Sequence, residues 1–329
     1  MAAKLDHSNR RITYLRVSIT DRCNMRCFYC MPPEGLRLLD HTDVLSYEEI
    51  LRVIDVAAQM GIRKVRITGG EPLLRRNVCH LVREIANVPG IEDVGLTTNG
   101  ILLKDMARPL WKAGLRRINV SLDTLNPLKF RKVTKIGSYH EVWQGIREAE
   151  SVGFKPIRIN VVAMRGINDD ELGRFARLSM ETPYSFRFIE YMPMGALSAW
   201  DASKFIAGSE TKARLQEYGQ LHPIPRDSSD GPCRRFRFEG ALGEIGFISP
   251  ISNHFCDSCD RLRLTADGKL RSCLLSDDEI DVREPLRGQQ SDRVIAGLIR
   301  KAIARKPKQH GIDAGSEPGQ LRAMSRIGG

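Results

Sequence analysis

The sequence predicts an α/β fold built around a parallel β-sheet. Six apolar, β-rich runs alternate with amphipathic helical stretches at intervals of roughly 25–40 residues, as the strands and helices of βα units do. Residues that could carry chemistry follow the ends of these runs, where the carboxyl ends of parallel strands gather. The alternation fits both a doubly wound sheet and a curved partial barrel, with right-handed crossovers in either case.

The predicted strands and helices can be placed along the chain. The strands are Tyr14–Thr20, Lys64–Thr68, Val94–Thr98, Arg117–Leu122, Pro156–Val162 and Ser185–Tyr191. The helices are Ser46–Met60, Asn77–Asn87, Leu103–Lys112, Glu141–Val152 and Asp169–Met180. The first helix is the most clearly marked, because Ser46 and Glu49 can form a capping box and Gly61 ends the pattern.

The rhythm changes after about Gly195. A helix is expected within Lys204–Tyr218, and Pro223–Pro232 has the Pro, Asp and Ser content typical of a linker. A basic helix is expected at Ser291–Lys306. Four short strands are predicted between the linker and this helix: Arg234–Glu239, Glu244–Ser249, Leu262–Ala266 and Leu270–Leu274. We therefore predict two parts, a barrel-like domain of residues 1–225 and a C-terminal domain of residues 226–329.

Composition narrows the function classes. The 329 residues carry a formal net charge of +11, which suits an anionic partner such as a nucleic acid, a membrane surface or a phosphorylated small molecule. No apolar run has the length of a signal peptide or a membrane span, so we expect a cytoplasmic protein. In that compartment the eight cysteines should stay reduced, which makes clustered cysteines candidate metal ligands.

The first cysteine group reads C-x3-C-x2-C, with its thiols at Cys23, Cys27 and Cys30. Three thiolates on one short loop can bind three irons of a 4Fe–4S cluster and leave the fourth iron open to a small molecule. A zinc site that takes a distant fourth ligand is the alternative. The spacing, with an aromatic residue just before the third cysteine, favours the open cluster.

The second cysteine group reads C-x2-C-x13-C, with its thiols at Cys256, Cys259 and Cys273. It could hold a second 4Fe–4S cluster, or a zinc ion with His254 as fourth ligand. Arg261 and Arg263 follow directly, and strand alternation places both side chains on one face. Two guanidinium groups beside an open iron suit an anionic or purine ligand.

The first cysteine group resembles the signature of the radical S-adenosylmethionine (SAM) superfamily. Thr68-Gly69-Gly70-Glu71-Pro72 resembles the superfamily's GGEP loop, whose backbone approaches the SAM amino group. The resemblance implies a partial (βα)6 TIM-like barrel with a C-terminal extension that carries a second iron–sulfur cluster. It also implies that SAM binds the open iron and is cleaved to a 5′-deoxyadenosyl radical.

The full pattern resembles one family more closely, the GTP 3′,8-cyclases of molybdenum cofactor biosynthesis. The two cysteine groups, the Arg-Leu-Arg segment and the terminal Gly328-Gly329 carry this resemblance. It implies that the radical takes hydrogen from C3′ of GTP, which then closes on C8 to give (8S)-3′,8-cyclo-7,8-dihydroguanosine 5′-triphosphate. It also implies a homodimer, an external electron donor and a cyclic pyranopterin monophosphate synthase as functional partner, with no nucleic acid or membrane partner.

The resemblance also assigns residues. It implies metal binding by the six cysteines of the two groups and catalytic roles for Arg261, Arg263, Gly328 and Gly329. SAM would be bound by Tyr29, Gly70, Ser121 and Met192. GTP would be bound by Arg16, Arg66, Thr97, Arg158, Arg187, Arg261 and Arg263. Arg158 stands where the family usually has Lys, which keeps the charge but changes the donor geometry.

Two other readings remain open at this point. A radical SAM peptide-modifying maturase with an auxiliary cluster would explain both cysteine groups, but not the Arg-Leu-Arg segment or the terminal glycines. A basic, metal-containing module that binds nucleic acid would explain the charge. Its weakness is that the charge is spread along the chain and no nucleic-acid motif with interleaved aromatic residues is present.

Overall fold

The computed structural model describes residues 5–32, 34–194, 200–225, 231–316 and 322–328. Its described strands form one sheet in the order β12-β11-β10-β1-β2-β3-β4-β5-β6-β9-β8-β7. The sheet does not close on itself, because β12 and β7 lie at its two edges. The α/β class predicted from the strand and helix alternation and the partial barrel implied by the family resemblance are therefore confirmed.

The centre of the sheet is parallel. The six predicted strands are all present, as β1 (Tyr14–Ser18), β2 (Lys64–Thr68), β3 (Asp93–Thr98), β4 (Arg117–Ser121), β5 (Arg158–Ala163) and β6 (Ser185–Glu190). Two strands from the C-terminal region extend it: β10 (Arg261–Leu264) pairs parallel with β1, and β9 (Glu244–Ile248) pairs parallel with β6. Antiparallel strands complete the edges: β11 (Lys269–Arg271), β12 (Glu279–Asp281), β8 (Arg234–Phe238) and β7 (Leu221–Pro223).

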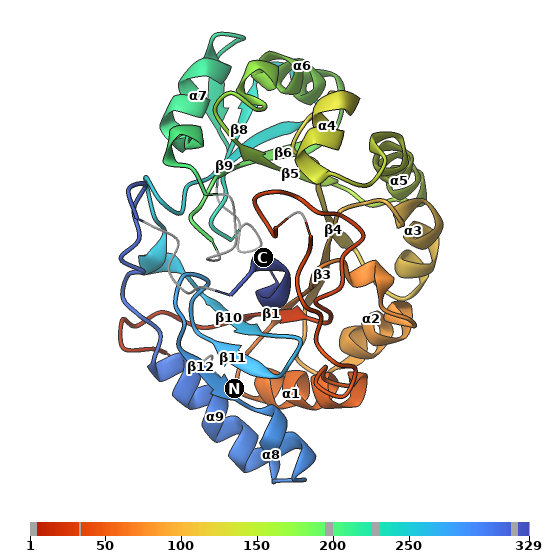
Figure 1. Ribbon diagram of the computed structural model, residues 1–329, viewed down its shortest axis with the longest axis vertical. Coiled ribbons are helices and arrows are strands. Elements are labelled where there is room, and N and C mark those ends of the chain that lie inside the picture. Colours follow the sequence, from red (N-terminus) through yellow and green to blue (C-terminus); the bar gives the residue numbers. More distant parts are fainter. Residues whose placement is uncertain (1–4, 33, 195–199, 226–230, 317–321, 329) are drawn as a thin grey trace.

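Helices lie along the outer side of this curved sheet (Figure 1). They are α1 (Tyr47–Gln59), α2 (Val78–Asn87), α3 (Leu103–Lys112), α4 (Pro127–Thr134), α5 (Tyr139–Val152), α6 (Leu172–Glu181), α7 (Gly208–Gln216), α8 (Arg283–Arg287) and α9 (Asp292–Ala304). A short last helix, α10 (Met324–Ile327), lies near the centre of the view, on the inner side of the sheet. The predicted Ser46–Glu49 capping box of α1 is present.

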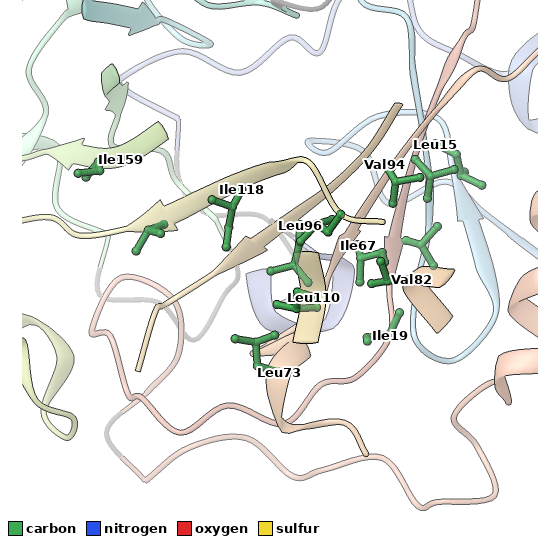
Figure 2. Packing of buried hydrophobic residues seen from close by; sticks show 14 of the residues in the cluster. Leu15, Ile19, Ile67, Leu73, Val82, Val94, Leu96, Leu110, Ile118 and Ile159 are labelled. Atoms are coloured by element: carbon green, nitrogen blue, oxygen red, sulfur yellow. The ribbon is translucent and has the colours of Figure 1, made fainter. Parts of the chain in front are cut away.

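The two faces of the strands differ in chemistry. On the outer face Leu15, Ile67, Leu96 and Ile118 pack among helix residues such as Leu110 of α3 (Figure 2). Burying a side chain of this size is worth about 1.5–3 kcal/mol, so this layer holds the helices on the sheet. Parallel strands covered on both faces are normally apolar throughout. Here the inner face is polar, which marks it as the lining of a site.

Some element boundaries differ from those predicted. The expected helix over Asp169–Met180 begins as a 3-10 turn, Asp169–Glu171, before α6. The helix expected within Lys204–Tyr218 is shorter, because Asp201 caps a separate turn at Ala202–Lys204 and the chain is extended before α7. The strand expected over Leu270–Leu274 ends at Arg271, ahead of the turn that carries Cys273. Helices α4, α8 and α10 were not predicted.

The predicted linker lies partly outside the described residues, which omit 226–230. Because β9 and β10 belong to the same sheet as β1 and β6, the described chain forms one continuous sheet across the predicted boundary. The division at residue 225 stays a prediction. None of the described helices has the length and apolarity that crossing a membrane requires.

Candidate active site

The first cysteine group occupies the loop that follows β1. Within it, the Cys30 backbone N–H donates to the Cys27 carbonyl (2.9 Å), which turns the chain tightly. Burial, and then the neighbouring thiol of Cys30, raises the pKa of Cys27 well above its usual value. Burial and then Cys23 raise the pKa of Cys30 to about 12. The three thiols thus lie close enough together to influence one another in a half-buried loop.

This arrangement fits a 4Fe–4S cluster. No three His, Cys, Asp or Glu side chains of the described residues gather around a position for a single metal ion. In a 4Fe–4S cluster each cysteine binds a different iron, so its ligands need not converge on one point. Three thiols on one loop, without a fourth beside them, are the ligand set of a cluster with one open iron.

The loop after β2 packs directly against the start of the cysteine loop. The Gly70 N–H donates to the Thr20 carbonyl (2.7 Å), and the Glu71 N–H donates to the Arg22 carbonyl (2.8 Å). A Cβ on Gly70 would lie 2.4 Å from the Arg22 carbonyl oxygen, so any larger residue would push the two loops apart. The buried Glu71 carboxylate accepts hydrogen bonds from the Asn99 N–H (2.7 Å) and the Thr98 hydroxyl (2.8 Å), which joins β3 to the same corner.

The residues predicted to bind SAM lie around this corner. The Tyr29 hydroxyl donates to the carboxylate of Asp123 (2.6 Å), which follows β4. Ser121 ends β4 and is in register with Asn160 of β5. Met192 follows β6 and lines a cavity on the inner face of the sheet. Asp123 was not among the predicted residues, although its place two residues after Ser121 at a strand end was a usable signal.

The cavity on the inner face, about 160 Å³ in volume, is lined mainly by polar side chains. Strand register explains this, since side chains opposite one another on parallel strands share a face. One row joins Arg263, Arg16 and Arg66 across β10, β1 and β2. The cavity-lining residues that the sequence predicted are Arg16, Arg66, Arg187, Met192, Arg261 and Arg263, and those it missed include Tyr14, Lys64, Arg117, Asn119 and Asn160.

Two predicted GTP-binding residues do not line this cavity. Thr97 of β3 and Arg158 of β5 stand on either side of Asn119 in the next row of the sheet. Both therefore share the inner face with the lining residues. The Thr97 hydroxyl and the Arg158 Nε are buried and have no hydrogen-bond partner within the described part of the chain.

Gly95 explains how Arg66 fits on this face. Gly95 lies opposite Arg66 on β3, and a Cβ there would come within 2.8 Å of the Arg66 guanidinium. The absent side chain leaves room for Arg66, whose Nε donates to the Tyr14 hydroxyl (2.8 Å). The Arg66 Nη1 is buried without a hydrogen-bond partner among the described residues.

The cavity is strongly positive. Beside the cavity, burial, and then the charges of Arg187, Arg117 and Arg66, lowers the pKa of Arg158 to about 9. Burial also lowers the pKa of Arg16 to about 10, against the favourable effect of Tyr14. Burial alone would raise the pKa of Tyr14, but the surrounding arginines outweigh it and lower that pKa to about 8. Buried like charges are costly unless a counter-charge joins them, so the cavity is built for an anion.

The second cysteine group lines a smaller cavity that adjoins the first. Its wall includes Cys256, Cys259 and Cys273. The two cavities share five lining residues: Pro250, Phe255, Arg261, Arg263 and Leu274. The Arg261 guanidinium lies over the Phe255 ring, 5.3 Å from its centre. Arg261 and Arg263 therefore stand between the three thiols and the anionic site, as the alternation of β10 predicted.

The sequence left zinc open as an alternative for the second group, with His254 as the fourth ligand. The His254 ring lies edge-on to the His310 ring, with the ring centres 5.7 Å apart. As for the first group, no single-ion position is formed by side chains in the described part of the chain. Three thiols around a small cavity fit a second cluster with an open iron, as the first group does.

Two buried cations that the sequence did not reveal hold the second group in place. Lys306 Nζ donates to the carbonyls of Arg261 (2.8 Å) and Ser272 (2.7 Å). Arg10 Nη1 donates to the Cys256 carbonyl (2.8 Å), and its guanidinium pairs with Asp6. Lys306 and Arg261 outweigh the effect of burial and lower the pKa of Cys259. The lone N-terminal Arg10 carried no local signal, and Lys306 read as the end of a basic helix.

The C-terminal tail reaches the same region. Arg263 Nη1 donates to the Gly328 carbonyl (2.7 Å), and Gly328 has a positive φ of 68° that favours glycine. The structure thus brings Gly328 to one of the arginines of the candidate site. The predicted role of Gly329 falls outside the described residues.

The fold and the first cysteine loop are those of the radical SAM class. The family model described as "Radical SAM superfamily" matches residues 17–179, which contain β1 to β5 and that loop. The model described as "Molybdenum Cofactor Synthesis C" matches residues 184–312, which contain the second cysteine group. The radical SAM class implies a 4Fe–4S cluster and SAM as cofactors.

Full-length relatives identify the family. A GTP 3′,8-cyclase of Thermodesulfovibrio yellowstonii is 49% identical over 98% of this chain and 99% of its own length. A GTP 3′,8-cyclase of Desulforamulus reducens is 48% identical over 99% of this chain and 100% of its own length. The chain belongs to the GTP 3′,8-cyclase family.

Solved structures agree on the fold. Streptococcus suis SuiB bound to S-adenosylmethionine has a TM-score of 0.59 and 16% identity, over 88% of this chain and 69% of that one. SuiB bound to the precursor peptide SuiA has a TM-score of 0.61 and 14% identity, over 88% of this chain and 68% of that one. At this level of identity the similarity concerns the fold alone.

Proposed function

We propose that this chain is a GTP 3′,8-cyclase that acts in molybdenum cofactor biosynthesis. The observation that carries the proposal is the arginine-lined cavity, which lies on the inner face of the sheet and adjoins the second cysteine group. A triphosphate supplies the negative charge that these buried guanidinium groups lack, and guanidinium forks match phosphate oxygens well.

The first half of the site prepares the radical. When bound, the cluster and SAM supply the 5′-deoxyadenosyl radical that takes hydrogen from C3′ of GTP. Cys23, Cys27 and Cys30 would hold three irons, and Gly70 would bring loop backbone close to SAM. Tyr29 would be held by Asp123, to which it donates a 2.6 Å hydrogen bond. Ser121 and Met192 would complete the SAM site at the ends of β4 and β6.

The second half binds and orients the nucleotide. Arg16, Arg66 and Arg187 line the cavity, and Arg158 and Thr97 lie on the same face with buried polar atoms that lack partners within the described residues. These atoms are hydrogen-bonding capacity that a bound nucleotide would use. Arg158 would thus serve in place of the family's usual Lys, through its guanidinium.

Arg261 and Arg263 would act where the two cavities meet. We propose that Cys256, Cys259 and Cys273 would hold a second 4Fe–4S cluster, which would offer an iron site to the guanine of the substrate. Arg263 would also hold the tail through the Gly328 carbonyl. The roles of Arg261, Arg263, Gly328 and Gly329 in ring closure are part of this proposal.

The further features that the family resemblance implies remain predictions. They are a homodimer, a cytoplasmic location, an external electron donor, and delivery of the product to a cyclic pyranopterin monophosphate synthase. The division into a barrel of residues 1–225 and a C-terminal domain of residues 226–329 belongs with them.

An anaerobic assay tests the proposal. The iron-reconstituted chain is incubated with SAM and a strong reductant, with and without GTP, and 5′-deoxyadenosine and GTP-derived pterin are quantified after oxidation. GTP should raise 5′-deoxyadenosine, and a pterin should appear. If SAM is cleaved but GTP does not change its cleavage and no pterin forms, the radical SAM activity would be supported. The substrate assignment would then be wrong, and the peptide-modifying alternative would be favoured.

The second cluster can be tested separately. In the Cys256→Ala/Cys259→Ala/Cys273→Ala variant the bound iron should fall by about half, since each cluster carries four irons. SAM cleavage without GTP should persist, and pterin formation should stop. An unchanged iron content would show that these cysteines hold no cluster.

A further inference from the structure

A groove of about 400 Å³ lies beside the first cysteine loop and belongs to neither of the cavities described above. We call it the lysine groove. It is lined by Phe28, Lys129, Lys132, Val133, Lys135, Gly166, Ile167 and Lys204. Half of these residues are lysines, and none is among the residues assigned to SAM or GTP.

The groove is joined directly to the loop that would hold the first cluster. The Phe28 N–H donates to the Val133 carbonyl (3.1 Å), and the Arg26 N–H donates to the Thr134 carbonyl (2.9 Å). Both acceptors lie in the last turn of α4. The α4 helix therefore anchors the cysteine loop and at the same time forms a wall of the groove.

Phe28 lies between the loop interior and the groove. It directly follows Cys27, and its ring meets the Tyr29 ring edge-on with 5.7 Å between centres. The Tyr29 hydroxyl is held by Asp123, whereas Phe28 lines the groove. A protein seated in the groove would thus contact a residue adjacent to a cluster ligand.

The charges of the groove are only partly neutralised. Lys129 pairs with Asp170 and with Glu171, and Lys204 pairs with Asp201. Lys132 and Lys135 are exposed and take part in no ion pair of the described part of the chain. The α4 sequence Pro127–Thr134 contains no acidic residue. Two exposed apolar side chains flank the lysines along the chain, Leu128 (76% exposed) and Ile136 (39% exposed).

We propose that the lysine groove is the docking surface for a small, acidic electron-carrier protein that reduces the first cluster. The proposal rests on the first cluster and not on the identity of the substrate. One electron leaves the carrier, which is oxidised, and enters the cluster, which is reduced; no bond forms or breaks in this step. Electron-transfer complexes are small and transient, and complementary charge governs their encounter more than buried area does.

Binding of a reduced flavodoxin to the iron-reconstituted chain tests this, with Lys132→Glu/Lys135→Glu as the variant. Its matched control is Lys104→Glu/Lys112→Glu, which makes the same charge change at two exposed positions of α3. We expect the dissociation constant to rise about tenfold in the groove variant, because two attractions become repulsions, and to change little in the control. Added salt should weaken wild-type binding more than binding to the groove variant.

SAM cleavage driven by dithionite should match the wild type in both variants, because that reductant needs no docking surface. If the groove variant melts at a lower temperature, Lys132→Gln/Lys135→Gln replaces it, with an expected loss of about threefold. The proposal is overturned if the groove variant binds flavodoxin as the wild type does, or if the control loses as much affinity. Salt-sensitive binding of an RNA instead, lost in the groove variant while flavodoxin binding is kept, would also overturn it.

Discussion

At the scale of one residue, the pKa of Tyr14 reflects the positive charge of the arginine-lined cavity on the inner face of the sheet. The Tyr14 hydroxyl accepts a hydrogen bond from Arg66 Nε (2.8 Å), and the charges of Arg66, Arg16 and Arg261 favour the phenolate. The other tyrosines with resolved shifts have raised pKa values, as Tyr47 and Tyr191 do, at about 12 each. A single early-ionising tyrosine should therefore be observable.

We predict that one tyrosine of the cluster-free protein ionises near pH 8, and that this step is missing in Tyr14→Phe. GTP should move the step to higher pH, because its phosphates offset the arginine charges. Since the folded pKa is below the unfolded value, the stability from Tyr14 is present above about pH 10 and lost as the pH falls through about 8. Tyrosinate absorbance and thermal melts measure both effects, and an early step that survives in Tyr14→Phe would contradict the assignment.

Arg158 combines a cost to the empty protein with a gain for binding. It is 5% exposed, its Nε has no hydrogen-bond partner within the described residues, and Arg187, Arg117 and Arg66 lower its pKa further after burial has done so. A residue that destabilises the free protein and awaits an anion is what a binding site requires.

We predict that Arg158→Met, which keeps the aliphatic stem, stabilises the GTP-free protein by about 1 kcal/mol. The same change should weaken GTP binding about tenfold or more, since a charged hydrogen-bond donor is lost. Arg158→Lys serves as the control and should bind GTP within a few-fold of the wild type. Thermal melts and GTP titrations decide the matter, and undiminished GTP binding by Arg158→Met would remove Arg158 from the site.

Helix α4 shows how a single element connects sequence to site. Asn126 caps it, with its side chain accepting from the Leu128 N–H (2.9 Å), and Pro127 occupies the first helical position. At its other end the carbonyls of Val133 and Thr134 accept from the cysteine loop. Fraying of the helix should therefore reach the first cluster.

We predict that Asn126→Ala costs about 1 kcal/mol of stability and speeds loss of iron from the first cluster to a chelator. Ser138→Ala removes the cap of α5, a helix without these contacts to the cysteine loop, and is the matched control. The comparison uses thermal melts and iron-release rates. Equal rates in the two variants would mean that α4 does not anchor the loop.

At the scale of the whole molecule, distant segments assemble the second cysteine group. Lys306 follows α9 and is 6% exposed, with hydrogen bonds to the carbonyls of Arg261 and Ser272. Arg10 ties the N-terminal segment both to Cys256 and to the Pro307 carbonyl (2.9 Å). The group thus depends on contacts that close the chain from both ends.

We predict that Lys306→Met lowers stability by roughly 2–4 kcal/mol, because two buried carbonyls lose their donor. The second cluster should be lost, so that bound iron falls by about half while SAM cleavage without GTP persists. The exposed Lys308 provides the control, Lys308→Met, which should keep its full iron content. A Lys306→Met protein with both clusters intact would show that Lys306 is not needed to position the cysteines.

Much of the molecule was predictable because its signals are local. The spacing of Cys23, Cys27 and Cys30 identified a cluster loop, and the six strands were placed to within one or two residues at most of their ends. The Ser46–Glu49 capping box is likewise a short-range hydrogen-bond pattern, and the structure confirms it. Arg261 and Arg263 were placed on one face by the period of a strand, and both line the cavity.

Tertiary structure decided which of these pieces meet. By itself the sequence determined the ligand chemistry, the strand count of the parallel core and the basic character of the site. It did not show that β10 pairs with β1, which sets Arg263 beside Arg16 although the two residues are far apart in the sequence.

Results

Sequence analysis

The sequence predicts an α/β fold built around a parallel β-sheet. Six apolar, β-rich runs alternate with amphipathic helical stretches at intervals of roughly 25–40 residues, as the strands and helices of βα units do. Residues that could carry chemistry follow the ends of these runs, where the carboxyl ends of parallel strands gather. The alternation fits both a doubly wound sheet and a curved partial barrel, with right-handed crossovers in either case.

The predicted strands and helices can be placed along the chain. The strands are Tyr14–Thr20, Lys64–Thr68, Val94–Thr98, Arg117–Leu122, Pro156–Val162 and Ser185–Tyr191. The helices are Ser46–Met60, Asn77–Asn87, Leu103–Lys112, Glu141–Val152 and Asp169–Met180. The first helix is the most clearly marked, because Ser46 and Glu49 can form a capping box and Gly61 ends the pattern.

The rhythm changes after about Gly195. A helix is expected within Lys204–Tyr218, and Pro223–Pro232 has the Pro, Asp and Ser content typical of a linker. A basic helix is expected at Ser291–Lys306. Four short strands are predicted between the linker and this helix: Arg234–Glu239, Glu244–Ser249, Leu262–Ala266 and Leu270–Leu274. We therefore predict two parts, a barrel-like domain of residues 1–225 and a C-terminal domain of residues 226–329.

Composition narrows the function classes. The 329 residues carry a formal net charge of +11, which suits an anionic partner such as a nucleic acid, a membrane surface or a phosphorylated small molecule. No apolar run has the length of a signal peptide or a membrane span, so we expect a cytoplasmic protein. In that compartment the eight cysteines should stay reduced, which makes clustered cysteines candidate metal ligands.

The first cysteine group reads C-x3-C-x2-C, with its thiols at Cys23, Cys27 and Cys30. Three thiolates on one short loop can bind three irons of a 4Fe–4S cluster and leave the fourth iron open to a small molecule. A zinc site that takes a distant fourth ligand is the alternative. The spacing, with an aromatic residue just before the third cysteine, favours the open cluster.

The second cysteine group reads C-x2-C-x13-C, with its thiols at Cys256, Cys259 and Cys273. It could hold a second 4Fe–4S cluster, or a zinc ion with His254 as fourth ligand. Two arginines follow directly, Arg261 and Arg263, and strand alternation places both side chains on one face. Two guanidinium groups beside an open iron suit an anionic or purine ligand.

The first cysteine group resembles the signature of the radical S-adenosylmethionine (SAM) superfamily. Thr68-Gly69-Gly70-Glu71-Pro72 resembles the superfamily's GGEP loop, whose backbone approaches the SAM amino group. The resemblance implies a partial (βα)6 TIM-like barrel with a C-terminal extension that carries a second iron–sulfur cluster. It also implies that SAM binds the open iron and is cleaved to a 5′-deoxyadenosyl radical.

The full pattern resembles one family more closely, the GTP 3′,8-cyclases of molybdenum cofactor biosynthesis. The two cysteine groups, the Arg-Leu-Arg segment and the terminal Gly328-Gly329 carry this resemblance. It implies that the radical takes hydrogen from C3′ of GTP, which then closes on C8 to give (8S)-3′,8-cyclo-7,8-dihydroguanosine 5′-triphosphate. It also implies a homodimer, an external electron donor and a cyclic pyranopterin monophosphate synthase as functional partner, with no nucleic acid or membrane partner.

The resemblance also assigns residues. It implies metal binding by the six cysteines of the two groups and catalytic roles for Arg261, Arg263, Gly328 and Gly329. SAM would be bound by Tyr29, Gly70, Ser121 and Met192. GTP would be bound by Arg16, Arg66, Thr97, Arg158, Arg187, Arg261 and Arg263. Arg158 stands where the family usually has Lys, which keeps the charge but changes the donor geometry.

Two other interpretations remain open at this point. A radical SAM peptide-modifying maturase with an auxiliary cluster would explain both cysteine groups, but not the Arg-Leu-Arg segment or the terminal glycines. A basic, metal-containing module that binds nucleic acid would explain the charge. Its weakness is that the charge is spread along the chain and no nucleic-acid motif with interleaved aromatic residues is present.

Overall fold

The computed structural model describes residues 5–32, 34–194, 200–225, 231–316 and 322–328. Its described strands form one sheet in the order β12-β11-β10-β1-β2-β3-β4-β5-β6-β9-β8-β7. The sheet does not close on itself, because β12 and β7 lie at its two edges. The α/β class predicted from the strand and helix alternation and the partial barrel implied by the family resemblance are therefore confirmed.

The centre of the sheet is parallel. The six predicted strands are all present, as β1 (Tyr14–Ser18), β2 (Lys64–Thr68), β3 (Asp93–Thr98), β4 (Arg117–Ser121), β5 (Arg158–Ala163) and β6 (Ser185–Glu190). Two strands from the C-terminal region extend it: β10 (Arg261–Leu264) pairs parallel with β1, and β9 (Glu244–Ile248) pairs parallel with β6. Antiparallel strands complete the edges: β11 (Lys269–Arg271), β12 (Glu279–Asp281), β8 (Arg234–Phe238) and β7 (Leu221–Pro223).

Helices lie along the outer side of this curved sheet (Figure 1). They are α1 (Tyr47–Gln59), α2 (Val78–Asn87), α3 (Leu103–Lys112), α4 (Pro127–Thr134), α5 (Tyr139–Val152), α6 (Leu172–Glu181), α7 (Gly208–Gln216), α8 (Arg283–Arg287) and α9 (Asp292–Ala304). A short last helix, α10 (Met324–Ile327), lies near the centre of the view, at the C-terminal end of the chain. The predicted capping box of α1, formed by Ser46 and Glu49, is present.

The two faces of the strands differ in chemistry. On the outer face Leu15, Ile67, Leu96 and Ile118 belong to the same buried cluster as helix residues such as Leu110 of α3 (Figure 2). Burying a side chain of this size is worth about 1.5–3 kcal/mol, so this layer holds the helices on the sheet. Parallel strands covered on both faces are normally apolar throughout. Here the inner face is polar, which marks it as the lining of a site.

Some element boundaries differ from those predicted. The helix expected over Asp169–Met180 begins as a 3-10 turn, Asp169–Glu171, before α6. The helix expected within Lys204–Tyr218 is shorter, because Asp201 caps a separate turn and the chain is extended before α7. The strand expected over Leu270–Leu274 ends three residues early, ahead of the turn that carries the last cysteine. Helices α4, α8 and α10 were not predicted.

The predicted linker lies partly outside the described residues, which omit 226–230. Because β9 and β10 belong to the same sheet as β1 and β6, the described chain forms one continuous sheet across the predicted boundary. The division at residue 225 stays a prediction. None of the described helices has the length and apolarity that crossing a membrane requires.

Candidate active site

The first cysteine group occupies the loop that follows β1. Within it, the Cys30 backbone N–H donates to the Cys27 carbonyl (2.9 Å), which turns the chain tightly. Burial, and then the neighbouring thiol of Cys30, raises the pKa of Cys27 well above its usual value. Burial and then Cys23 raise the pKa of Cys30 to about 12. The three thiols thus lie close enough together to influence one another in a half-buried loop.

This arrangement fits a 4Fe–4S cluster. No three His, Cys, Asp or Glu side chains of the described residues gather around a position for a single metal ion. In a 4Fe–4S cluster each cysteine binds a different iron, so its ligands need not converge on one point. Three thiols on one loop are the ligand set of a cluster with one open iron.

The loop after β2 packs directly against the start of the cysteine loop. The Gly70 N–H donates to the Thr20 carbonyl (2.7 Å), and the Glu71 N–H donates to the Arg22 carbonyl (2.8 Å). A Cβ on Gly70 would lie 2.4 Å from the Arg22 carbonyl oxygen, so any larger residue would push the two loops apart. The buried Glu71 carboxylate accepts a hydrogen bond from the Asn99 N–H (2.7 Å), which joins the end of β3 to the same corner.

The residues predicted to bind SAM come from the cysteine loop and from segments at or after strand ends. The Tyr29 hydroxyl donates to the carboxylate of Asp123 (2.6 Å), which follows β4. Ser121 ends β4 and is in register with Asn160 of β5. Met192 follows β6 and lines a cavity on the inner face of the sheet. Asp123 was not among the predicted residues, although its place just after a strand end was a usable signal.

The cavity on the inner face, about 160 Å³ in volume, is lined mainly by polar side chains. Strand register explains this, since side chains opposite one another on neighbouring strands share a face. One row joins Arg263, Arg16 and Arg66 across β10, β1 and β2. The lining residues that the sequence predicted are Arg16, Arg66, Arg187, Met192, Arg261 and Arg263, and those it missed include Tyr14, Lys64, Arg117, Asn119 and Asn160.

Two predicted GTP-binding residues do not line this cavity. Thr97 of β3 and Arg158 of β5 stand on either side of Asn119 in the next row of the sheet. Both therefore share the inner face with the lining residues. The Thr97 hydroxyl and the Arg158 Nε are buried and have no hydrogen-bond partner within the described part of the chain.

A glycine makes room for Arg66 on this face. Gly95 lies opposite Arg66 on β3, and a Cβ there would come within 2.8 Å of the guanidinium. Arg66 Nε donates to the Tyr14 hydroxyl (2.8 Å). Its Nη1 is buried without a hydrogen-bond partner among the described residues.

The cavity is strongly positive. Beside the cavity, burial, and then the charges of Arg187, Arg117 and Arg66, lowers the pKa of Arg158 to about 9. Burial alone would raise the pKa of Tyr14, but the surrounding arginines outweigh it and lower that pKa to about 8. Buried like charges are costly unless a counter-charge joins them, so the cavity is suited to an anion.

The second cysteine group lines a smaller cavity that adjoins the first. Its wall includes Cys256, Cys259 and Cys273. The Arg261 guanidinium lies over the Phe255 ring, 5.3 Å from its centre. The two cavities share five lining residues: Pro250, Phe255, Arg261, Arg263 and Leu274. The two arginines of β10 therefore line both cavities, and strand alternation had predicted that their side chains share one face.

The sequence left zinc open as an alternative for the second group, with His254 as the fourth ligand. The His254 ring lies edge-on to the His310 ring, with the ring centres 5.7 Å apart. As for the first group, side chains in the described part of the chain form no single-ion position. Three thiols around a small cavity fit a second cluster with an open iron.

Two buried cations that the sequence did not reveal hold the second group in place. Lys306 Nζ donates to the carbonyls of Arg261 (2.8 Å) and Ser272 (2.7 Å). Arg10 Nη1 donates to the Cys256 carbonyl (2.8 Å). Burial alone would raise the pKa of Cys259, but Lys306 and then Arg261 outweigh it and lower that pKa. No local sequence pattern marked Arg10 as a residue of this site, and Lys306 was predicted only as the end of a basic helix.

The C-terminal tail reaches the same region. Arg263 Nη1 donates to the Gly328 carbonyl (2.7 Å), and Gly328 has a positive φ of 68° that favours glycine. The structure thus brings Gly328 to one of the arginines of the candidate site. The predicted role of Gly329 falls outside the described residues.

The fold and the first cysteine loop are those of the radical SAM class. The family model described as "Radical SAM superfamily" matches residues 17–179, which include that loop. The model described as "Molybdenum Cofactor Synthesis C" matches residues 184–312, which include the second cysteine group. The radical SAM class implies a 4Fe–4S cluster and SAM as cofactors.

Full-length relatives identify the family. A GTP 3′,8-cyclase of Thermodesulfovibrio yellowstonii is 49% identical over 98% of this chain and 99% of its own length. A GTP 3′,8-cyclase of Desulforamulus reducens is 48% identical over 99% of this chain and 100% of its own length. The chain belongs to the GTP 3′,8-cyclase family.

Solved structures agree on the fold. Streptococcus suis SuiB bound to S-adenosylmethionine has a TM-score of 0.59 and 16% identity, over 88% of this chain and 69% of that one. SuiB bound to the precursor peptide SuiA has a TM-score of 0.61 and 14% identity, over 88% of this chain and 68% of that one. At this level of identity the similarity concerns the fold alone.

Proposed function

We propose that this chain is a GTP 3′,8-cyclase that acts in molybdenum cofactor biosynthesis. The observation that carries the proposal is the arginine-lined cavity, which lies on the inner face of the sheet and adjoins the second cysteine group. A triphosphate supplies the negative charge that these guanidinium groups require, and guanidinium forks match phosphate oxygens well.

The first half of the site would hold the cofactors. When bound, the cluster and SAM supply the 5′-deoxyadenosyl radical that takes hydrogen from C3′ of GTP. The three thiols of the first cysteine group would hold three irons, and Gly70 would bring loop backbone close to SAM. Tyr29 would be oriented by Asp123, to which it donates a 2.6 Å hydrogen bond. Ser121 and Met192 would complete the SAM site at the ends of β4 and β6.

The second half would bind and orient the nucleotide. Arg16, Arg66 and Arg187 line the cavity, and Thr97 and Arg158 lie on the same face with buried polar atoms that lack partners within the described residues. These atoms are hydrogen-bonding capacity that a bound nucleotide would use. Arg158 would thus serve in place of the family's usual Lys.

The two arginines of β10 would act where the two cavities meet. We propose that Cys256, Cys259 and Cys273 would hold a second 4Fe–4S cluster, which would offer an iron site to the guanine of the substrate. Catalytic roles for Arg261, Arg263, Gly328 and Gly329 in ring closure are part of this proposal. The hydrogen bond from Arg263 to the Gly328 carbonyl supports it for two of these four residues.

Other features that the family resemblance implies remain predictions. They are a homodimer, a cytoplasmic location, an external electron donor, and delivery of the product to a cyclic pyranopterin monophosphate synthase. The division into a barrel of residues 1–225 and a C-terminal domain of residues 226–329 belongs with them.

An anaerobic assay tests the proposal. The iron-reconstituted chain is incubated with SAM and a strong reductant, with and without GTP, and 5′-deoxyadenosine and GTP-derived pterin are quantified after oxidation. GTP should raise 5′-deoxyadenosine, and a pterin should appear. If SAM is cleaved but GTP does not change its cleavage and no pterin forms, the radical SAM activity would be supported. The substrate assignment would then be wrong, and the peptide-modifying alternative would be favoured.

The second cluster can be tested separately. In the Cys256→Ala/Cys259→Ala/Cys273→Ala variant the bound iron should fall by about half, since one of two four-iron clusters is lost. SAM cleavage without GTP should persist, and pterin formation should stop. An unchanged iron content would show that these cysteines hold no cluster.

A further inference from the structure

A groove of about 400 Å³ lies beside the first cysteine loop and is separate from the two cavities described above. We call it the lysine groove. It is lined by Phe28, Lys129, Lys132, Val133, Lys135, Gly166, Ile167 and Lys204. Half of these residues are lysines, and none is among the residues assigned to SAM or GTP.

The groove is joined directly to the loop that would hold the first cluster. The Phe28 N–H donates to the Val133 carbonyl (3.1 Å), and the Arg26 N–H donates to the Thr134 carbonyl (2.9 Å). Both acceptors lie in the last turn of α4. This helix therefore anchors the cysteine loop and also forms a wall of the groove.

Phe28 connects the loop to the groove. It directly follows Cys27, and its ring meets the Tyr29 ring edge-on with 5.7 Å between centres. The Tyr29 hydroxyl is held by Asp123, whereas Phe28 lines the groove. A protein seated in the groove would thus contact a residue adjacent to a cluster ligand.

The charges of the groove are partly neutralised. Lys129 pairs with Asp170 and Glu171, and Lys204 pairs with Asp201. The other two lysines of the groove, Lys132 and Lys135, are exposed. Neither takes part in an ion pair within the described part of the chain. Two exposed apolar side chains flank the lysines along the chain, Leu128 (76% exposed) and Ile136 (39% exposed).

We propose that the lysine groove is the docking surface for a small, acidic electron-carrier protein that reduces the first cluster. The proposal rests on the first cluster and not on the identity of the substrate. One electron leaves the carrier, which is oxidised, and enters the cluster, which is reduced; no bond forms or breaks in this step. Electron-transfer complexes are small and transient, and complementary charge steers their encounter.

Binding of a reduced flavodoxin to the iron-reconstituted chain tests this, with Lys132→Glu/Lys135→Glu as the groove variant. Its matched control is Lys104→Glu/Lys112→Glu, which makes the same charge change at two exposed positions of α3. We expect the dissociation constant to rise about tenfold in the groove variant, because two attractions become repulsions, and to change little in the control. Added salt should weaken wild-type binding more than binding to the groove variant.

SAM cleavage driven by dithionite should match the wild type in both variants, because that reductant needs no docking surface. If the groove variant melts at a lower temperature, Lys132→Gln/Lys135→Gln replaces it, with an expected loss of about threefold. The proposal is overturned if the groove variant binds flavodoxin as the wild type does, or if the control loses as much affinity. Loss of RNA binding in the groove variant, with flavodoxin binding kept, would also overturn it.

Discussion

At the scale of one residue, the pKa of Tyr14 reflects the positive charge of the arginine-lined cavity on the inner face of the sheet. The Tyr14 hydroxyl accepts a hydrogen bond from Arg66 Nε (2.8 Å), and the nearby arginine charges favour the phenolate. Other tyrosines are shifted the opposite way: burial raises the pKa of Tyr47 and of Tyr191 to about 12 each. An early-ionising tyrosine should therefore stand out.

We predict that one tyrosine of the cluster-free protein ionises near pH 8, and that this step is missing in Tyr14→Phe. GTP should move the step to higher pH, because its phosphates offset the arginine charges. Since the folded pKa is below the unfolded value, the stability from Tyr14 is present above about pH 10 and lost as the pH falls through about 8. Tyrosinate absorbance and thermal melts measure both effects, and an early step that survives in Tyr14→Phe would contradict the assignment.

Arg158 is costly to the free protein, and an anionic ligand would offset that cost. It is 5% exposed, and its Nε has no hydrogen-bond partner within the described residues. Burial lowers its pKa, and the neighbouring arginines lower it further. A side chain that destabilises the free protein in this way is one that an anionic ligand can stabilise.

We predict that Arg158→Met, which keeps the aliphatic stem, stabilises the GTP-free protein by about 1 kcal/mol. The same change should weaken GTP binding about tenfold or more, since a charged hydrogen-bond donor is lost. Arg158→Lys serves as the control and should bind GTP within a few-fold of the wild type. Thermal melts and GTP titrations decide the matter, and undiminished GTP binding by Arg158→Met would remove Arg158 from the site.

Helix α4 shows how a single element connects sequence to site. Asn126 caps it, with its side chain accepting from the Leu128 N–H (2.9 Å), and Pro127 occupies the first turn. At the other end, the carbonyls of Val133 and Thr134 accept from the cysteine loop. Fraying of this short helix should therefore reach the first cluster.

We predict that Asn126→Ala costs about 1 kcal/mol of stability and speeds loss of iron from the first cluster to a chelator. The matched control is Ser138→Ala, which removes the side-chain cap of the neighbouring helix α5. Thermal melts and iron-release rates are compared between the two. Equal iron-release rates would mean that α4 does not anchor the loop.

At the scale of the whole molecule, distant segments assemble the second cysteine group. Lys306 follows α9 and is 6% exposed, with its hydrogen bonds directed to the carbonyls of Arg261 and Ser272. Arg10 ties the N-terminal segment both to Cys256 and to the Pro307 carbonyl (2.9 Å). The group thus depends on contacts from both ends of the chain.

We predict that Lys306→Met lowers stability by roughly 2–4 kcal/mol, because two buried carbonyls lose their donor. The second cluster should be lost, so that bound iron falls by about half while SAM cleavage without GTP persists. The exposed Lys308 provides the control, Lys308→Met, which should keep its full iron content. A Lys306→Met protein with both clusters intact would show that Lys306 is not needed to position the cysteines.

Much of the fold was predictable because the sequence patterns that indicate it are local. The capping box of Ser46 and Glu49 is a short-range hydrogen-bond pattern, and it is present in the structure. Strand period placed Arg261 and Arg263 on one face, and both line the arginine cavity. Helix α4 escaped prediction because a short segment such as Pro127–Thr134 carries little periodic signal.

By itself the sequence determined the two groups of clustered cysteines, the six strands of the barrel and the basic character of the candidate site. Only the tertiary structure decided that β10 pairs with β1, which sets Arg263 opposite Arg16 from the other end of the chain. It also decided that Lys306 and Arg10 are buried beside the second cysteine group. The physical reason is distance along the chain. Metal-ligand spacing and strand period are patterns within a short stretch of sequence, whereas these pairings depend on where the folded sheet brings distant segments together.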